Sequence, residues 1–110
     1  MYEDEQNYHL LFKYSKEGTL SDLIKKEGKI SEKNAREITL KILKGIKFMH
    51  ERGYYHRDIK PHNILCFDSA TLDVRITDFG LAVPIASDKM VLKRKCGTPG
   101  YVDPAILLSK

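Results

Sequence analysis

Four polar side chains that could perform chemistry stand in two short stretches of the sequence. Asp58, Lys60 and Asn63 fall within "YHRDIKPHNIL", and Asp78 follows further along the chain. A carboxylate such as Asp58 can orient a hydroxyl group and take its proton, and the ammonium of Lys60 can neutralise charge on a group in transfer. An amide oxygen (Asn63) and a second carboxylate (Asp78) are hard oxygen ligands suited to Mg²⁺. Together these are the parts of a phosphoryl-transfer site, because that reaction depends on positioning and charge stabilisation.

Short strands are predicted on either side of the polar loop. Val74 and Ile76 alternate with polar neighbours in "VRIT", which predicts a half-buried strand that leads to Asp78. The stretch "ILCF" predicts a second small strand, "SATLD" predicts the turn between the two, and "YYH" before the loop is expected to be extended. The apolar and aromatic run "YHLLFKYS", residues 8–15, predicts a further strand.

Two helices are predicted before the polar loop. Thr19 is a suitable N-cap for a helix over "LSDLIKKE", and Gly28 ends it. Ser31 is the N-cap of a longer helix from Glu32 to about Glu51, with its stop at Arg52 and Gly53. Its apolar residues recur at spacings of three and four, which predicts one buried face. That face consists of Ala35, Ile38, Ile42, Ile46 and Met49, widened by Leu43 and Phe48.

Composition and charge fit one globular domain. Of the 110 residues, 42% are hydrophobic and 31% are charged, which excludes disordered and fibrous classes. The formal charge of +4 is mild and does not indicate a nucleic-acid partner. No apolar run approaches the roughly 18 residues of a membrane span, and the polar N-terminus does not resemble a signal peptide. The two cysteines have no CxxC spacing, and the histidines have no zinc-ligand spacing, so we expect a reduced, intracellular protein without structural metal.

Three motifs, in this order, resemble those of the eukaryotic protein kinase family. "HRDIKPHN" (56–63), "DFG" (78–80) and "CGTPGY" (96–101) are similar to its catalytic loop, metal-binding loop and substrate-side loop. A single "DFG" would carry little information, whereas the ordered set is specific. "IKPHN", in which lysine follows the aspartate by two, resembles the serine/threonine branch, and "CGTPGY" is most similar to the calcium/calmodulin-dependent group.

The resemblance implies a role for each matching residue of the catalytic and metal-binding loops. Asp58 would be the catalytic base that accepts or orients the substrate hydroxyl, and Lys60 would contact the γ-phosphate of ATP. Asn63 and Asp78 would hold Mg²⁺.

The resemblance also implies a set of residues that bind ATP. Phe12 resembles the gatekeeper residue, and Tyr14 and Ser15 resemble the hinge, whose backbone forms hydrogen bonds with adenine. Leu65 would lie under the adenine, and Asp78 is the fifth residue expected to contact ATP.

The activation segment is implied by the same resemblance. Arg57 would bind a phosphate on it, and Thr98 would sit beside Asp58 and Lys60. His56 and Phe79 would be packing residues, and Gly80 completes the "DFG" turn.

The fold implied by the resemblance is α+β and protein-kinase-like. It would be mainly the helical large (C-terminal) lobe with short β-hairpins, truncated at both ends, so residues 1–110 would form one partial kinase domain. No two glycines are spaced i, i+2 and no Ala-x-Lys occurs, so the glycine-rich loop and the ATP-anchoring lysine are absent. Ala105 stands where the family has glutamate in Ala-Pro-Glu, and Arg94 stands where many relatives have a phosphorylatable threonine. Ser87 is the only hydroxyl of the activation segment before Thr98.

The expected function is ATP- and Mg²⁺-dependent phosphorylation of serine or threonine in protein substrates, without nucleic-acid or membrane partners. The isolated chain is expected to be inactive, because missing kinase segments or a partner chain would be needed. One alternative is a pseudokinase-like or truncated module that binds partners. Another is a small-molecule kinase, against which "DFG" followed by "GTPGY" argues. The expected location is the cytoplasm, with the nucleus as the alternative.

Overall fold

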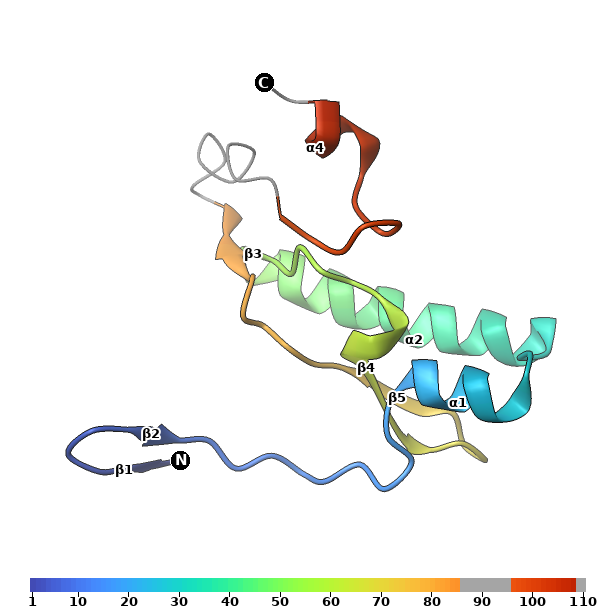
Figure 1. Cartoon of the computed structure of the whole chain (residues 1–110), viewed down its shortest axis with the longest axis horizontal. Coiled ribbons are helices and arrows are strands. Elements are labelled where there is room, and N and C mark those ends of the chain that lie inside the picture. Colours follow the sequence, from blue (N-terminus) through green and yellow to red (C-terminus); the bar gives the residue numbers. More distant parts are fainter. Residues whose placement is uncertain (86–95, 109–110) are drawn as a thin grey trace.

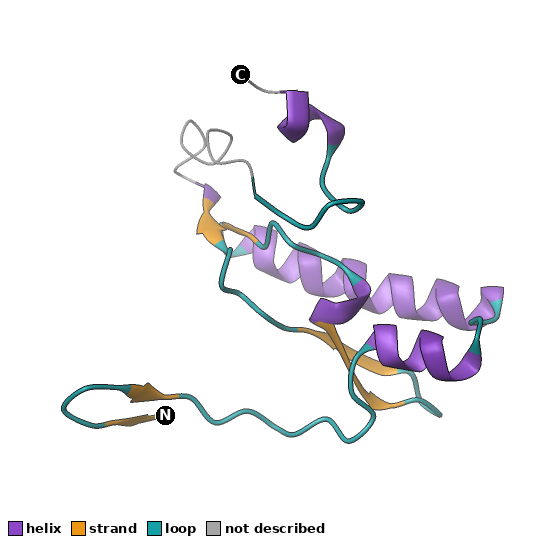
Figure 2. Cartoon of the chain, viewed as in Figure 1, coloured by secondary structure: helices purple, strands orange, loops and turns teal. Residues whose placement is uncertain are grey.

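The computed structural model describes residues 1–85 and 96–108, in which helices and short strands are mixed (Figure 2). In Figure 1 the two longer helices lie beside a hairpin, while the N-terminal stretch extends away from them. This extension makes the Cα radius of gyration 16.0 Å, against roughly 13 Å for a compact domain of this length. The elements, in chain order, are β1 (Tyr2–Glu3), β2 (Tyr8–His9), α1 (Leu20–Glu27), α2 (Glu32–Glu51), β3 (Tyr54–Tyr55), η1 (Pro61–Asn63), β4 (Ile64–Asp68), β5 (Asp73–Ile76), β6 (Val83–Pro84) and α4 (Pro104–Leu108).

Local capping sets the ends of the two longer helices, as the sequence predicts. The Thr19 side chain accepts a hydrogen bond from the Asp22 backbone, and the Asp22 carboxylate accepts one from the Thr19 backbone, which forms a capping box. Gly28 ends α1 at φ 74°, a left-handed conformation that glycine adopts readily. Ser31 caps α2 by accepting from the Asn34 backbone N–H at 3.2 Å. Neither helix is long and apolar enough to cross a membrane, nor is any other helix in the described ranges.

The β4–β5 hairpin confirms the two strands predicted around the turn. Its antiparallel register places Ile64 opposite Ile76, Leu65 opposite Arg75 and Cys66 opposite Val74. Because side chains alternate between the two faces of a strand, Ile64 and Cys66 lie on one face of the hairpin. Leu65 lies on the other face, together with Arg75 opposite it. The first face packs into the core, and the second borders the candidate site.

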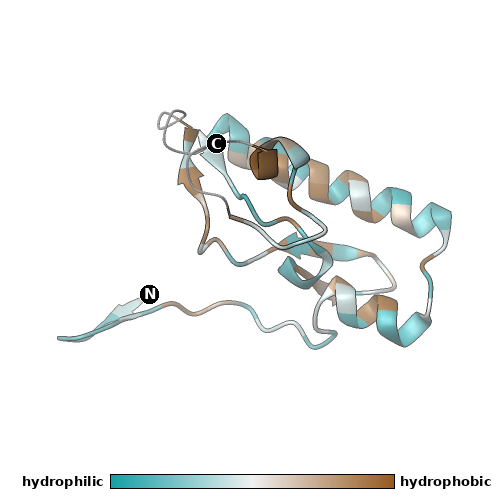
Figure 3. Ribbon diagram, turned by 45° about the horizontal axis from the view of Figure 1, so that its top comes forward, coloured by the Kyte–Doolittle hydropathy of each residue, from teal (hydrophilic) through white to brown (hydrophobic). Residues whose placement is uncertain are grey.

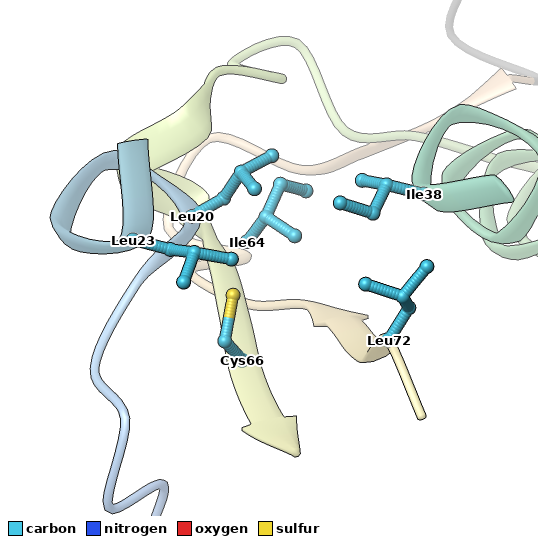
Figure 4. Packing of buried hydrophobic residues seen from close by; sticks show 6 residues of the cluster. All are labelled: Leu20, Leu23, Ile38, Ile64, Cys66 and Leu72. Atoms are coloured by element: carbon cyan, nitrogen blue, oxygen red, sulfur yellow. The ribbon is translucent and has the colours of Figure 1, made fainter. Parts of the chain in front are cut away.

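The core lies where α1 and α2 meet the inner face of this hairpin (Figure 4). Ile64 and Cys66 are each only 1% exposed. The helix α2 approaches the hairpin at Gly45, where an added Cβ would lie 3.0 Å from the Ile76 side chain. The six buried hydrophobic residues of this cluster are Leu20, Leu23, Ile38, Ile64, Cys66 and Leu72.

The strand predicted over residues 8–15 is wrong for most of its length. Only Tyr8–His9 form a strand, paired with Tyr2–Glu3 of β1. Leu10, Leu11, Phe12 and Tyr14 are between 60% and 80% exposed. A strand needs a neighbour for its backbone hydrogen bonds, and none of the described residues lies alongside residues 10–14 as a strand.

The predicted apolar face of α2 is only partly buried. Ile38 is buried and Ile42 packs against the core, but Ala35 is exposed and Leu43 and Phe48 are each 55% exposed. The reason is geometric, because a two-stranded hairpin covers a narrow stripe of a helix. Figure 3 shows hydrophobic residues recurring along α2 between hydrophilic ones.

Candidate functional site

The loop between β3 and η1 is held in a specific backbone conformation. Arg57 has φ 70°, in the left-handed region that side chains rarely adopt, and such residues often mark functional sites. His56, which is 4% exposed, anchors the turn. Its Nδ1 accepts the Asp58 backbone N–H at 3.3 Å and its Nε2 donates to the Thr77 carbonyl at 2.9 Å, which fits the neutral imidazole protonated at Nε2. The His56 ring also meets the Phe79 ring edge-on at 5.3 Å.

Asp58, Lys60, Asn63 and Thr98 form one hydrogen-bonded cluster, the polar cluster. Lys60 Nζ lies 2.9 Å from Asp58 Oδ2 and donates to Thr98 Oγ1 at 2.6 Å. Thr98 Oγ1 in turn donates to Asp58 Oδ1 at 2.6 Å. Asn63 Nδ2 donates both to the Asp58 carbonyl (2.8 Å) and to Asp58 Oδ2 (2.9 Å). The Asp58 side chain is 10% exposed, so these contacts are largely shielded from water.

The cluster sets the protonation of its carboxylate. The hydrogen bond from Thr98, and next that from Lys60, lower the pKa of Asp58 below its ordinary value of 3.8. Burial opposes them with a smaller effect, and the hydrogen bond from Asn63 lowers the pKa by less than burial raises it. Asp58 is therefore ionised at neutral pH. A carboxylate of low pKa is a weak base, so its contribution to a reaction would come chiefly from orienting a hydroxyl group.

Removing the Thr98 hydroxyl is expected to raise the pKa of Asp58 toward 3.8. Because the folded-state pKa is lowered, Asp58 stabilises the fold above that ordinary value, and this contribution is lost as the pH falls through the folded-state pKa. Thr98→Val keeps the shape but not the donor, so the stabilisation from Asp58 should be smaller, and its loss on acidification should be complete at a higher pH. NMR titration of the Asp58 carboxyl carbon measures the change. The pKa of Asp68, which is lowered chiefly by the Thr71 side chain, should not move and serves as the control.

Thr98 reaches the polar cluster because its neighbour Gly97 has no side chain. Gly97 adopts φ 113°, and a Cβ there would lie 3.2 Å from the Arg57 carbonyl oxygen. The motif "CGTPGY" therefore requires glycine at this position on both conformational and steric grounds. Arg57 itself donates from Nε to the Leu81 carbonyl at 2.6 Å, which ties the loop to the segment after "DFG". The predictions that concern Ser87 and Arg94 lie outside the described residues.

Asp78 stands at one side of a cavity of about 570 Å³. It follows β5 with φ 61°, and its Oδ1 accepts the Gly80 backbone N–H at 3.2 Å. Of the residues predicted to bind ATP, Phe12, Leu65 and Asp78 line this cavity. Tyr14 and Ser15 are not among its lining residues. Their predicted role, bonding adenine through the backbone, stays a prediction.

The buried Ser15 instead anchors the segment that precedes α1. Its hydroxyl lies 3.1 Å from the Gly18 carbonyl and makes a second hydrogen bond to the Cys66 carbonyl on β4. The residues that line the cavity also include Lys13, Phe67 and Arg75, for which the sequence predicts no role in the site. Strand alternation gives no clear signal for Phe67, because the β4–β5 register is irregular between Cys66 and Asp68.

The donor set fits a hard divalent cation. Asn63 uses its amide nitrogen on Asp58, which leaves the amide oxygen as the atom that can act as a ligand. Asp78 is an exposed carboxylate. Mg²⁺ is commonly held by one or two protein oxygens together with substrate phosphates, and these two side chains match that pattern.

Comparison with known proteins places this geometry in a family. The family model described as "Protein kinase domain" matches residues 1–110. The chain is 38% identical over 109 residues to serine/threonine-protein kinase RAD53 of Saccharomyces cerevisiae, and these cover 99% of this chain and 13% of that protein. It is 36% identical over 110 residues to calcium/calmodulin-dependent protein kinase type 1 of Macrobrachium nipponense (99% of this chain, 31% of that protein). It is 37% identical over 102 residues to CBL-interacting serine/threonine-protein kinase 8 of Arabidopsis thaliana (93% and 22%).

The chain thus spans less than a third of the length of each of these relatives. The match nevertheless covers all 110 residues, including the three motifs and the polar cluster. The chain belongs to the protein kinase domain family.

Proposed function

We propose that this chain supplies the catalytic and metal-binding loops of a serine/threonine protein kinase that transfers the γ-phosphoryl group of ATP to protein hydroxyl groups. The observation that carries the proposal is the polar cluster. Asp58, Lys60, Asn63 and Thr98 all contact one another or a shared neighbour within 2.9 Å. A regulatory module without catalytic function would not need this set intact.

In the proposed reaction, the members of the polar cluster and Asp78 divide the work of the site. Asp58 orients the substrate hydroxyl and accepts its proton, and Lys60 offsets the charge on the transferring phosphoryl group. Asn63 and Asp78 would hold Mg²⁺, which would supply positive charge to neutralise the phosphates. Thr98, on the activation segment, keeps Asp58 and Lys60 at a fixed separation through its hydroxyl.

The cavity is the proposed nucleotide site. Phe12 and Leu65 offer apolar surface for adenine, and Asp78 stands at the same cavity for the metal and phosphates. The backbone of Tyr14 and Ser15 would bond the adenine edge. In this assignment α1, α2 and the β4–β5 hairpin belong to the large lobe of a kinase, and residues 1–110 form part of one kinase domain.

We further propose that the 110 residues alone do not catalyse transfer, because they contain no glycine-rich loop and no Ala-x-Lys to hold the ATP phosphates. A second candidate function, binding of partner proteins without catalysis, is favoured by the exposed apolar side chains of α2. Leu40, Leu43 and Phe48 are between 53% and 55% exposed.

Thermal unfolding with and without Mg–ATP tests the nucleotide site. A ligand that binds the native state raises the melting temperature by mass action, so millimolar Mg–ATP should raise it. Asp78→Asn should abolish the increase, whereas the matched variant Asp68→Asn, at the end of β4, should retain it. An unchanged melting temperature for the wild-type chain, or an equal increase in Asp78→Asn, would contradict nucleotide binding at this cavity.

A further inference from the structure

The segment that carries the proposed adenine-binding residues has few side-chain anchors. This segment, residues 10–18, is here called the linker segment. Its Phe12 and Tyr14 side chains are each 80% exposed. One anchor is the Ser15 hydroxyl, which bonds the Cys66 and Gly18 carbonyls near the start of α1. The other lies nearer the cavity, where Lys13 Nζ is 5.4 Å from the centre of the Phe67 ring. This distance lies within the range of a cation–π contact.

The Phe67 ring projects from the face of the hairpin that borders the cavity. Leu65 and Phe67 of β4 both line the cavity, although the pairing of β4 with β5 is irregular between Cys66 and Asp68. Arg75 lies directly opposite Leu65 in the register, so it lies on the same face as Leu65. All three line the cavity, as does Lys13. A contact between Lys13 and Phe67 therefore fixes the linker segment to the surface that holds Leu65.

A second cation approaches the same ring. The Arg75 guanidinium lies 4.4 Å from the Phe67 ring centre. Asp73 holds it there, since Arg75 Nε donates to Asp73 Oδ1 (3.2 Å) and NH2 donates to Oδ2 (2.8 Å). The pKa of Asp73 is lowered mainly by Arg75 and more weakly by Lys13 and Lys41. The carboxylate thus attracts both cations at the ring and offsets the repulsion between them.

We propose that Lys13, Phe67 and Arg75 form a clamp that fixes the linker segment to the β4–β5 hairpin, and that they are positioning residues for nucleotide binding. The part that concerns nucleotide rests on the proposed function. The clamp acts by holding Phe12 opposite Leu65 across the cavity before the nucleotide arrives. A preformed site binds its ligand more tightly, because fewer side chains and loops have to become ordered when the ligand binds.

Two substitutions remove the clamp without removing a proposed nucleotide ligand. Lys13→Met keeps the chain length and removes the charge, and Phe67→Leu keeps an apolar residue and removes the ring. In the protein that carries this chain, each should lower ATP affinity by about two- to fivefold, the range of one partly exposed cation–π contact. The double variant should bind ATP no more weakly than Phe67→Leu alone, because loss of the ring already removes the Lys13 contact. Lys13→Arg and Phe67→Tyr should retain wild-type affinity.

A readout independent of nucleotide separates the clamp from the proposed function. Backbone nitrogen relaxation reports motion on the picosecond-to-nanosecond scale. Residues 10–14 should become more mobile in Lys13→Met, while the control Lys47→Met, on the exposed side of α2, should leave them unchanged. Unchanged mobility in Lys13→Met, or additive losses of affinity in the double variant, would overturn the clamp. No ATP binding by the wild-type protein, with the mobility change still present, would overturn the nucleotide role and the proposed function but not the clamp.

Discussion

Replacing Asp58 with asparagine is expected to lower the rate of phosphoryl transfer by about 10²- to 10⁴-fold in an active kinase that contains these residues. Asparagine has nearly the same shape, and its single amide oxygen can still accept the hydrogen bond from Thr98. Its amide nitrogen cannot accept the bonds that Lys60 and Asn63 make to the second carboxylate oxygen. Asparagine cannot accept a proton and carries no charge beside the substrate hydroxyl. The effect should therefore fall on kcat. The KM for ATP should change little, because Asp58 does not line the cavity.

The control for this experiment is Asp4→Asn. Asp4 lies in the turn between β1 and β2, where its carboxylate accepts backbone hydrogen bonds that asparagine can also accept. Steady-state kinetics with a serine-containing peptide measure both variants. A kcat for Asp58→Asn within twofold of wild type would remove Asp58 from the proposed mechanism. A kcat loss in both variants would indicate a general loss of folding instead, which thermal unfolding would reveal.

Replacing Ile64 with alanine is expected to cost about 2–5 kcal/mol of unfolding free energy. Ile64 is 1% exposed and lies at the centre of a core of six buried residues. The free energy of unfolding of a small domain is only about 5–15 kcal/mol, so a loss of this size would remove a large fraction of its stability. The residue also follows Asn63 directly, so loss of packing here would disturb the polar cluster.

Urea unfolding measures this prediction against two matched variants. Ile64→Val should cost about 0.5–1.5 kcal/mol, because it removes one methylene group from the same place. Leu11→Ala should lie within about 0.5 kcal/mol of wild type, since Leu11 is 72% exposed. Equal effects of Ile64→Ala and Leu11→Ala would show that the core does not lie where the structure puts it.

Helix ends were predictable because their determinants are local. Thr19 and Ser31 each accept a hydrogen bond from the backbone three residues later, and these caps can be recognised in a short window of sequence. The strand over residues 8–15 depended instead on a partner strand. The apolar pattern was present, but among the described residues only β1 pairs with this region, at Tyr8–His9. The apolar pattern alone therefore predicts a longer strand than the one that forms.

The chemistry of the site was predictable from residue types. The family resemblance also placed Thr98 beside Asp58 and Lys60, as the structure has it, but residue types and local spacing alone do not give these contacts. The motifs identified Asp58, Lys60 and Asn63, which lie within a few residues of one another. The hydrogen bond between Asp58 and Thr98 joins residues 40 positions apart, and its formation depends on the close approach at Gly97. The Lys13–Phe67 contact likewise joins distant segments. Such contacts follow from how the segments fold together, which no local pattern contains.

The most direct test of the phosphoryl-transfer proposal is a graft. Residues 1–110 would replace the matching residues of calcium/calmodulin-dependent protein kinase type 1 of Macrobrachium nipponense, to which they are 36% identical. The measurement is Mg²⁺-dependent transfer of labelled γ-phosphate from ATP to a serine peptide. The proposal predicts transfer by the graft and its loss in Asp58→Asn. A folded graft that binds Mg–ATP but transfers no phosphate would contradict it and favour a partner-binding role.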